Sequence, residues 1–541
     1  MTFLRIPPFP GRGIREFEHL SQAPGKPVSL SECLALAREK RVGGAYWARQ
    51  PELPPSFLLV RSAAALASCS SLVERHGDIL LWPTGSANAS SKWPTIVGEC
   101  DPWHMLGGAG AVVCEPADEV RLMAAILGIP TYVVNTPGGE PKLWEGRDEE
   151  LFKDAMPIAA SFSNPFTGQA MNLVELIELC GFWRSLIDSN RSIDCAVGFA
   201  FWKQESVFPL LWGGGEGTAF FRNSVRGTQN RTVALWRAKA SRDVLARLDR
   251  QGTPVVEVED GFLRSQGLGA DCVPPLSITV DHLGPYFDPG QPSELENLLQ
   301  NGCFDPPLLA RARQLRETIV AAGLGKYESG DAILGRLHDT NRHILVPGQV
   351  EDDRAVLTGG AGLDSNLELL RRVRARAPDA YLIYKPHPDV VAGHRKGSIG
   401  AKECLDFADK VVIDAPIASL IAMVDEVHVN TSLAGFEALM RDKKVTTYGV
   451  PFYAGWGLTC DLGPVPARRT AKRTLDELVA ASLLIYPRYL DPVSGLPCPA
   501  EIVVERLAKP SSQRAGPLVR LRRMQGRWNR RLAAWRAGDA R

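Results

Sequence analysis

The chain has 541 residues, of which 45% are hydrophobic and 23% are charged, a composition typical of globular proteins. Because one hydrophobic core rarely serves more than about 250 to 300 residues, we expect about three compact units. The 62 Lys and Arg residues nearly balance the 61 Asp and Glu residues, which argues against general polyanion binding by the whole molecule.

The eleven cysteines form no C-x-x-C pair, which favours reduced, mostly buried thiols over a disulfide or zinc framework. The N-terminus lacks a charged segment followed by an apolar stretch. No uncharged apolar run approaches the roughly 18 to 20 residues needed to cross a bilayer. We therefore expect a cytoplasmic protein that at most touches a membrane surface.

Residues 1–160 are predicted to form an α/β region. A strand at 110–113, a helix at 120–127 and a strand at 130–134 follow one another, and this order echoes the segment 427–448. The echo suggests a degenerate remnant of a similar lobe.

Two further lobes follow, at 161–340 and 341–510, and each alternates short β-branched runs with helix-period segments. This alternation predicts a GT-B-like α/β fold, in which two parallel Rossmann-type lobes face each other across a cleft. The first lobe includes a linker from about 292. Its predicted strands are 195–198, 232–235 and 255–258; those of the second are 343–346, 381–384, 411–413, 427–429 and 445–447.

Polar clusters follow several of these strands, where parallel sheets bind ligands. Glu259 and Asp260 precede Gly261, and either carboxylate could accept a proton from an attacking hydroxyl, although Asp-Gly is also a common turn pair. Arg264 could clamp the carboxylate of an acidic sugar. Gln349 and the acidic run ending at Asp353 follow the next lobe's first strand, where a solvated loop is the alternative interpretation.

Later loops suggest a phosphate site. Prolines brace His387 next to Lys385, and an imidazole beside an ammonium suits a phosphate. Thr431 and Ser432 lie where a strand ends and a helix begins, so they can cap the helix and also bind an anion; Glu437 suits the first turns of that helix. The aromatic and glycine-rich segment 451–457 includes Tyr453 and Trp456, which could form a substrate-facing lid or fill the core.

Taken together, these motifs resemble the C-terminal transferase module of KpsC-type capsule-synthesis β-Kdo transferases over residues 160–505. The matching segments are 164–168, 178–184, 200–203, 258–289, 346–353, 385–389, 432–439 and 451–458. The acidic-Gly and His-Pro pairs also resemble motifs of bacterial transferases that use CMP-sialic acid, which points to a CMP-activated donor.

The resemblance implies retaining transfer of Kdo from CMP-β-Kdo to a lipid-linked Kdo or saccharide acceptor. Double displacement needs a carboxylate nucleophile and an acid/base group. By motif, Asp353 is the nucleophile and Glu259 the acid/base, with Asp260 as the fallback. The groups holding the CMP phosphate would be Lys385, His387, Thr431 and Ser432. No metal or other cofactor is expected, because these cations and the helix dipole can balance the leaving-group charge.

Familiar members of that family carry two complete transferase modules, whereas this chain matches one, so the acceptor and linkage stay open. The alternatives are a transferase for another CMP-ulosonic acid and a non-catalytic scaffold that holds other capsule-assembly proteins or lipid.

The tail at 511–541 is strongly basic, with nine arginines and one acidic residue between Arg514 and Arg541. Its apolar residues recur every three or four positions, which predicts an amphipathic helix suited to the anionic cytoplasmic face of the inner membrane. A terminal helix packed on the enzyme is the alternative, and RNA binding has no other support in the chain.

Overall fold

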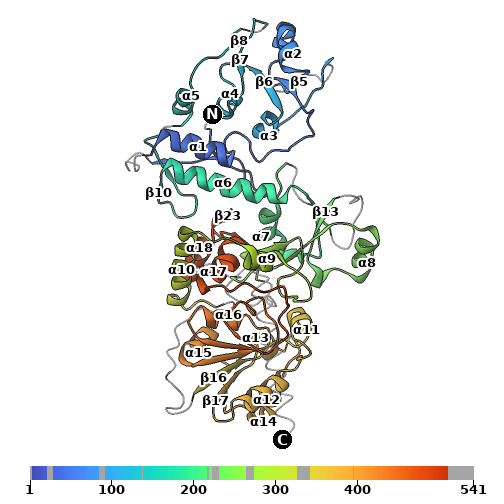
Figure 1. Cartoon of the computed structure of the whole chain (residues 1–541), viewed down its shortest axis with the longest axis vertical. Helices are drawn as coiled ribbons and strands as arrows, with labels where there is room; N and C mark the ends of the chain where they lie inside the picture. The colour runs from blue at the N-terminus through green and yellow to red at the C-terminus, as the bar shows by residue number, and fades with distance from the viewer. Residues whose placement is uncertain are drawn as a thin grey trace. The chain divides into compact units, whose positions relative to one another are not determined.

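The computed structural model describes residues 3–20, 28–84, 92–136, 138–156, 158–215, 219–221, 231–263, 273–325, 335, 342–393 and 395–509. The protein is a mixed α/β protein with several sheets that are wholly or partly parallel (Figure 1). It divides into two compact units: unit 1 comprises Met1–Ile193 and Leu211–Thr218, and unit 2 comprises Asp194–Leu210 and Ala219–Arg541. Arg264 and the basic tail lie outside the described residues.

Unit 1 is built around a five-stranded sheet of order β5-β4-β6-β7-β8, in which β8 alone is antiparallel to its neighbour. The predicted strand–helix–strand segment is confirmed as β6, α4 and β7. The strands are β4 Phe57–Val60, β5 Ile79–Leu81, β6 Ala109–Cys114, β7 Thr131–Val133 and β8 Lys142–Leu143. The helices around the sheet are η1 Ala63–Ser68, α2 Ser70–His76, α3 Pro102–Leu106, α4 Val120–Leu127 and α5 Asp148–Ala155.

The rest of unit 1 packs two longer helices, α1 Leu30–Lys40 and α6 Leu173–Asn190, against each other (Figure 1). Asn172 and Glu175 start α6 with a reciprocal capping box. Short strands complete this part: β1 Arg5–Ile6, β2 Arg15–Glu16, β3 His19–Leu20, β9 Ser161–Ser163 and β10 Ala170–Met171.

The first sheet of unit 2 has seven strands in the order β12-β11-β13-β14-β15-β22-β23. The strands predicted from the sequence are present, but the expectation of a parallel lobe is wrong for part of this sheet, because β15, β22 and β23 pair antiparallel. The strands are β11 Ile193–Val197, β12 Ala219–Phe221, β13 Thr232–Leu235, β14 Val255–Asp260, β15 Ser277–Asp281, β22 Pro487–Leu490 and β23 Pro497–Cys498. Its helical segments are α7 Phe201–Leu211, η2 Arg237–Lys239, α8 Arg242–Gln251, α9 Glu294–Asn301, α10 Pro306–Ala321, α17 Leu475–Val479, η4 Ala480–Ile485 and α18 Ala500–Ala508.

The second sheet of unit 2 is parallel, in the order β18-β17-β16-β19-β20-β21. After β16 the chain adds β17 and β18 on one side of the sheet, and it then adds β19, β20 and β21 on the other side. The strand order therefore reverses between β16 and β19. Ligands in such sheets bind beyond the strand ends at the switch. The strands are β16 His343–Pro347, β17 Tyr381–Lys385, β18 Lys410–Val411, β19 Glu426–Val429, β20 Lys444–Thr447 and β21 Cys460–Asp461. The helices are α11 Arg354–Gly359, α12 Asn366–Arg376, α13 Pro388–Val391, α14 Ala401–Leu405, α15 Ile417–Met423 and α16 Ala434–Leu439.

Most of the described cysteines are buried free thiols, as expected; Cys303 and Cys460 are exposed. Among the described residues, no helix is both long and apolar enough to span a bilayer.

Candidate active site

Glu259 lies near the carboxyl end of β14, where it contacts Arg354, the first residue of α11. Arg354 Nη1 donates to Glu259 Oε1 at 2.6 Å, and the Glu259 side chain is only 16% exposed. Burial raises the pKa of Glu259 to about 7, although the Arg354 charge acts to lower it. A carboxyl group with this pKa can donate and accept protons near neutral pH.

The neighbouring Asp260 is held by a different cation. Lys203 Nζ, from α7, donates to Asp260 Oδ1 at 3.1 Å and lies 3.4 Å from the centre of the Trp236 ring. Both carboxylates therefore have a cationic partner, and burial outweighs the effect of that partner on the pKa of Glu259. This raised pKa makes Glu259 the better acid/base candidate.

Asp353 lies at the start of α11, one residue before Arg354. Its carboxylate accepts from the backbone N–H of Ala355 at 3.0 Å, and half of the side chain is exposed. Asp352 pairs with Arg395 at 3.1 Å. Arg354, which contacts Glu259, directly follows Asp353 in the chain. The pair Asp353–Arg354 therefore connects the two carboxylates to which the sequence assigned catalytic roles.

The loop after β16 is also bonded to the loop after β19. Gln349 Nε2 donates to Thr431 Oγ1 at 2.9 Å, and the Thr431 N–H donates to Gln349 Oε1 at 2.9 Å. The Asn366 side chain fixes the backbone of Gln349. It accepts from the Gln349 N–H and donates to the Gln349 carbonyl oxygen, both at 2.8 Å. The two strand ends at the switch point therefore lie side by side.

The proposed phosphate groups differ in their surroundings. Lys385 is 4% exposed and donates to the carbonyl oxygens of Ile413 and Ala415, at 3.1 and 2.6 Å. It therefore braces the loop after β18, contrary to the predicted phosphate contact. His387 is partly exposed and accepts the Asp389 N–H at Nδ1, at 3.1 Å, which puts the proton of the neutral ring on Nε2.

Ser432 is partly exposed, and its hydroxyl accepts from the Ala434 N–H at 3.2 Å. This bond at the start of α16 agrees with the predicted capping role. The Ser432 hydroxyl also directly follows Thr431, the residue that bonds Gln349. Glu437 is 5% exposed within α16. In this structure it is a buried residue of the helix.

The aromatic segment 451–457 packs inside unit 2. Tyr453 and Trp456 are both 0% exposed; Tyr453 Oη donates to the Ser432 carbonyl oxygen, and Trp456 Nε1 donates to the Phe452 carbonyl oxygen at 2.8 Å. The interpretation as a sugar-facing lid is therefore wrong for these two rings in this structure. Tyr453 supports the Ser432 loop through its bond to the Ser432 carbonyl oxygen.

Phe262, three residues beyond Glu259, joins this packing. Its ring centre lies 4.6 Å from that of Phe452 and 6.1 Å from that of Phe436. The contact ties the end of β14 to α16, so it helps fix the position of Glu259 relative to the strand ends of the second sheet.

We expect Phe262→Ala to lower the free energy of unfolding by about 3 to 5 kcal/mol, because the ring is 3% exposed and its loss leaves a cavity. Chemical denaturation measures this change. Leu405→Ala is the control, since Leu405 is 57% exposed and should cost little. Equal effects of the two substitutions would contradict the packing role.

Comparisons with known proteins place this site in a family. The model of the capsule polysaccharide biosynthesis protein family matches residues 231–489. The capsule polysaccharide modification protein LipA of Neisseria meningitidis serogroup A is 37% identical over 365 residues, which is 66% of this chain and 52% of LipA. The lipopolysaccharide-processing protein LpsZ of Rhizobium meliloti is 47% identical over 257 residues, 47% of this chain and 58% of LpsZ.

A solved structure, the KpsC β-Kdo 2,4 transferase of Thermosulfurimonas dismutans, is 32% identical with a TM-score of 0.51, and the match covers 58% of this chain and 98% of that one. The chain belongs to the capsule polysaccharide biosynthesis family. It spans about half the length of the curated LipA relatives that it matches.

The chain is therefore related to KpsC Kdo transferases. Every candidate from Glu259 to Trp456 lies within the segment matched by the family model. Sequence reasoning missed Arg354 and Asn366, and it did not assign Lys203 a role. Arg354 directly follows the acidic run, so its position was the available signal, but its partner is 95 positions away in the chain.

Proposed function

We propose that this protein is a retaining glycosyltransferase that moves β-Kdo from CMP-Kdo to a lipid-linked saccharide acceptor in capsule or surface-polysaccharide synthesis. The observation that carries the proposal is the 2.6 Å contact between Arg354, which follows Asp353, and Glu259. The relation to the KpsC β-Kdo transferase supports the donor. The two sheets of unit 2 would act as a GT-B-like pair, with 161–340 on the acceptor side and 341–510 binding the CMP-sugar.

The first step would be attack of an Asp353 carboxylate oxygen on the anomeric carbon of Kdo. The bond from that carbon to the CMP phosphate oxygen breaks, and its electron pair leaves with CMP. His387, Thr431 and Ser432 would stabilise the phosphate charge. In the second step an acceptor hydroxyl attacks the same carbon, Glu259 takes its proton, and the Asp353 carboxylate is released. Two inversions give net retention.

The decisive test is to incubate the full chain with CMP-Kdo and a synthetic Kdo-lipid and to record the product mass and anomeric configuration. We expect a gain of one Kdo in the β configuration. Transfer only from CMP-sialic acid would reassign the donor, and no transfer from either donor would favour the scaffold alternative.

Arg354 gives a prediction about pH. Its charge lowers the pKa of Glu259, so Arg354→Met should raise that pKa. Since the second step needs ionised Glu259, the acidic limb of the kcat/KM profile should move to higher pH in the variant. Arg354→Lys, which keeps the charge, should restore the limb. If the acidic limb of the kcat/KM profile stays in place in Arg354→Met, Arg354 does not influence the pKa of the acid/base group.

We also propose that the basic tail binds the cytoplasmic face of the inner membrane, where a lipid-linked acceptor would lie. Deleting the residues after Arg514 should weaken flotation with vesicles containing anionic lipid, because the deletion removes eight of the nine arginines in the segment Arg514–Arg541. Unchanged flotation would contradict the proposal.

A further inference from the structure

Unit 1 contains a cavity of about 320 Å³ that the proposed transfer does not use. It lies outside the segment matched by the family model, and part of its wall comes from the segments that follow three parallel strands, β4, β5 and β6. Arg61 directly follows β4, Trp82 directly follows β5, and Glu119 precedes α4 after β6.

The cavity lies where the strand order of this sheet reverses. β4 pairs with β5 on one side and with β6 on the other, so the connection from β5 to β6 crosses over β4. Crevices beyond the strand ends at such a reversal are the usual ligand sites of open α/β sheets.

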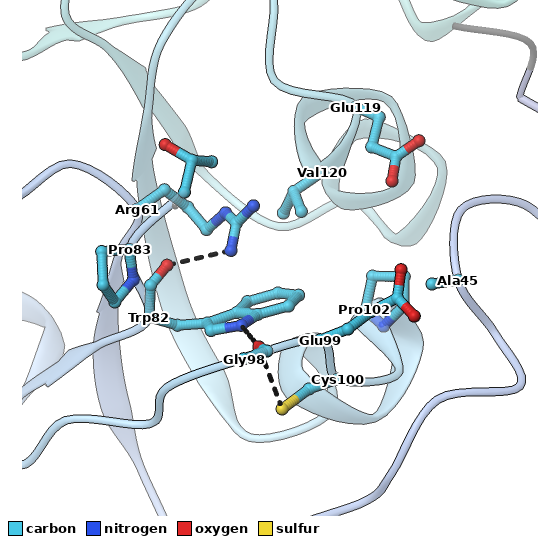
Figure 2. Close-up of a pocket in the computed structure, with 11 residues that line it drawn as sticks. Ala45, Arg61, Trp82, Pro83, Gly98, Glu99, Cys100, Pro102, Glu119 and Val120 are labelled. Atoms are coloured by element: carbon cyan, nitrogen blue, oxygen red, sulfur yellow. Dashed lines mark hydrogen bonds between the residues drawn. The ribbon is translucent and has the colours of Figure 1, made fainter. Parts of the chain in front are cut away.

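One residue that lines the cavity is an arginine, Arg61, whose guanidinium group is held in place by its neighbours. Arg61 is 9% exposed and its guanidinium carbon lies 3.8 Å from the centre of the Trp82 ring. Nε donates to Asp118 at 2.9 Å, and Nη1 donates to the Trp82 carbonyl oxygen at 2.9 Å. No acceptor among the described residues bonds Nη2, and Figure 2 shows this nitrogen facing the space in front of Val120.

Carboxylates stand across the cavity from Arg61. Figure 2 shows Glu99 and Glu119 on the side opposite the Trp82–Arg61 stack. Glu119 accepts two bonds from Arg5, at 3.1 and 3.0 Å. Among the residues that line the cavity, Arg61 is paired with Asp118, and Glu119 is paired with Arg5. Burial raises the pKa of Glu99. These ion pairs leave no unpaired positive charge in the lining to attract phosphates or acidic sugars.

We propose that this cavity binds a neutral, hydroxyl-rich saccharide unit. Hydroxyl groups both donate and accept, so they can accept from Arg61 Nη2 and donate to Glu99 and Glu119, while the indole supplies an apolar wall. The volume is at the lower end of the roughly 300 to 1,000 Å³ typical of small-molecule sites, which fits one or two sugar rings. The site does not depend on the proposed transferase function.

The test uses the full chain and saturation-transfer NMR with the methyl glycosides of glucose, galactose, N-acetylglucosamine and rhamnose. We expect a saturable signal from at least one of them. Glu99→Gln should weaken that binding about tenfold, as expected for a lost hydrogen bond to a charged group. Glu115→Gln is the matched control, because Glu115 is exposed on the same unit and does not line the cavity.

Arg61→Lys provides a second variant that keeps the charge but removes the planar donor pair, and it should weaken the same signal. The proposal is overturned if none of the four glycosides binds, or if Glu99→Gln leaves binding unchanged. It is also overturned if the Kdo methyl glycoside or inorganic phosphate binds in their place and loses affinity in Arg61→Lys.

Discussion

Asp353→Asn is expected to abolish sugar transfer while leaving CMP binding within a few-fold of the unaltered protein. Loss of a covalent nucleophile typically lowers kcat by at least about a thousandfold. The fold should survive, because Asn caps a helix about as well as Asp, and capping is the structural bond that Asp353 makes in α11. Turnover with CMP-Kdo and calorimetric titration with CMP measure the two effects.

Asp352→Asn is the matched control. Asp352 is the preceding residue, is 47% exposed and pairs with Arg395, so its loss should leave kcat within a few-fold. Near-normal turnover of Asp353→Asn would remove Asp353 from the mechanism, and equal losses in both variants would indicate a general effect of charge in this loop.

Glu259→Gln is expected to lower kcat by about 100-fold to 10,000-fold, the usual contribution of a general acid or base. The pH profile gives the sharper result. The pKa of Glu259 is raised to about 7 by burial, and the second step needs the ionised form, so transfer by the unaltered enzyme should fall as pH drops below about 7. The Gln variant should lose this dependence.

Asp260→Asn distinguishes the two adjacent acids. Asp260 is bonded by Lys203, so its loss should perturb local packing and leave the pH limb in place. Should the limb vanish in Asp260→Asn and persist in Glu259→Gln, the acid/base role would pass to Asp260.

Local sequence patterns were sufficient to locate most strands and the loops that carry the candidate groups. Apolar runs such as Ile344–Val346 are short, buried and followed by polar or glycine residues, so their positions follow from hydrophobicity and turn chemistry. Because ligands bind beyond parallel strand ends, Glu259, Gln349 and Thr431 could be named before any contact was known. The roles of these residues stay predictions until the variants are measured.

Side-chain partners were decided only by the tertiary structure. Lys385 and His387 look equivalent in the sequence, yet the lysine is turned inward to two carbonyl oxygens, while the histidine stays partly exposed. Tyr453 and Trp456 are equally suited to a sugar or to a core, and burial against residues distant in the chain settled which applies.

The sequence by itself therefore determined the α/β class and the strand-end location of the candidate groups, since both depend on periodicity and on neighbouring residues. The tertiary structure decided the Arg354–Glu259 contact, the antiparallel return of β22 beside β15 and the cavity beside Trp82. Each of these joins segments far apart in the chain, and such pairings depend on how whole elements pack, which no local pattern encodes.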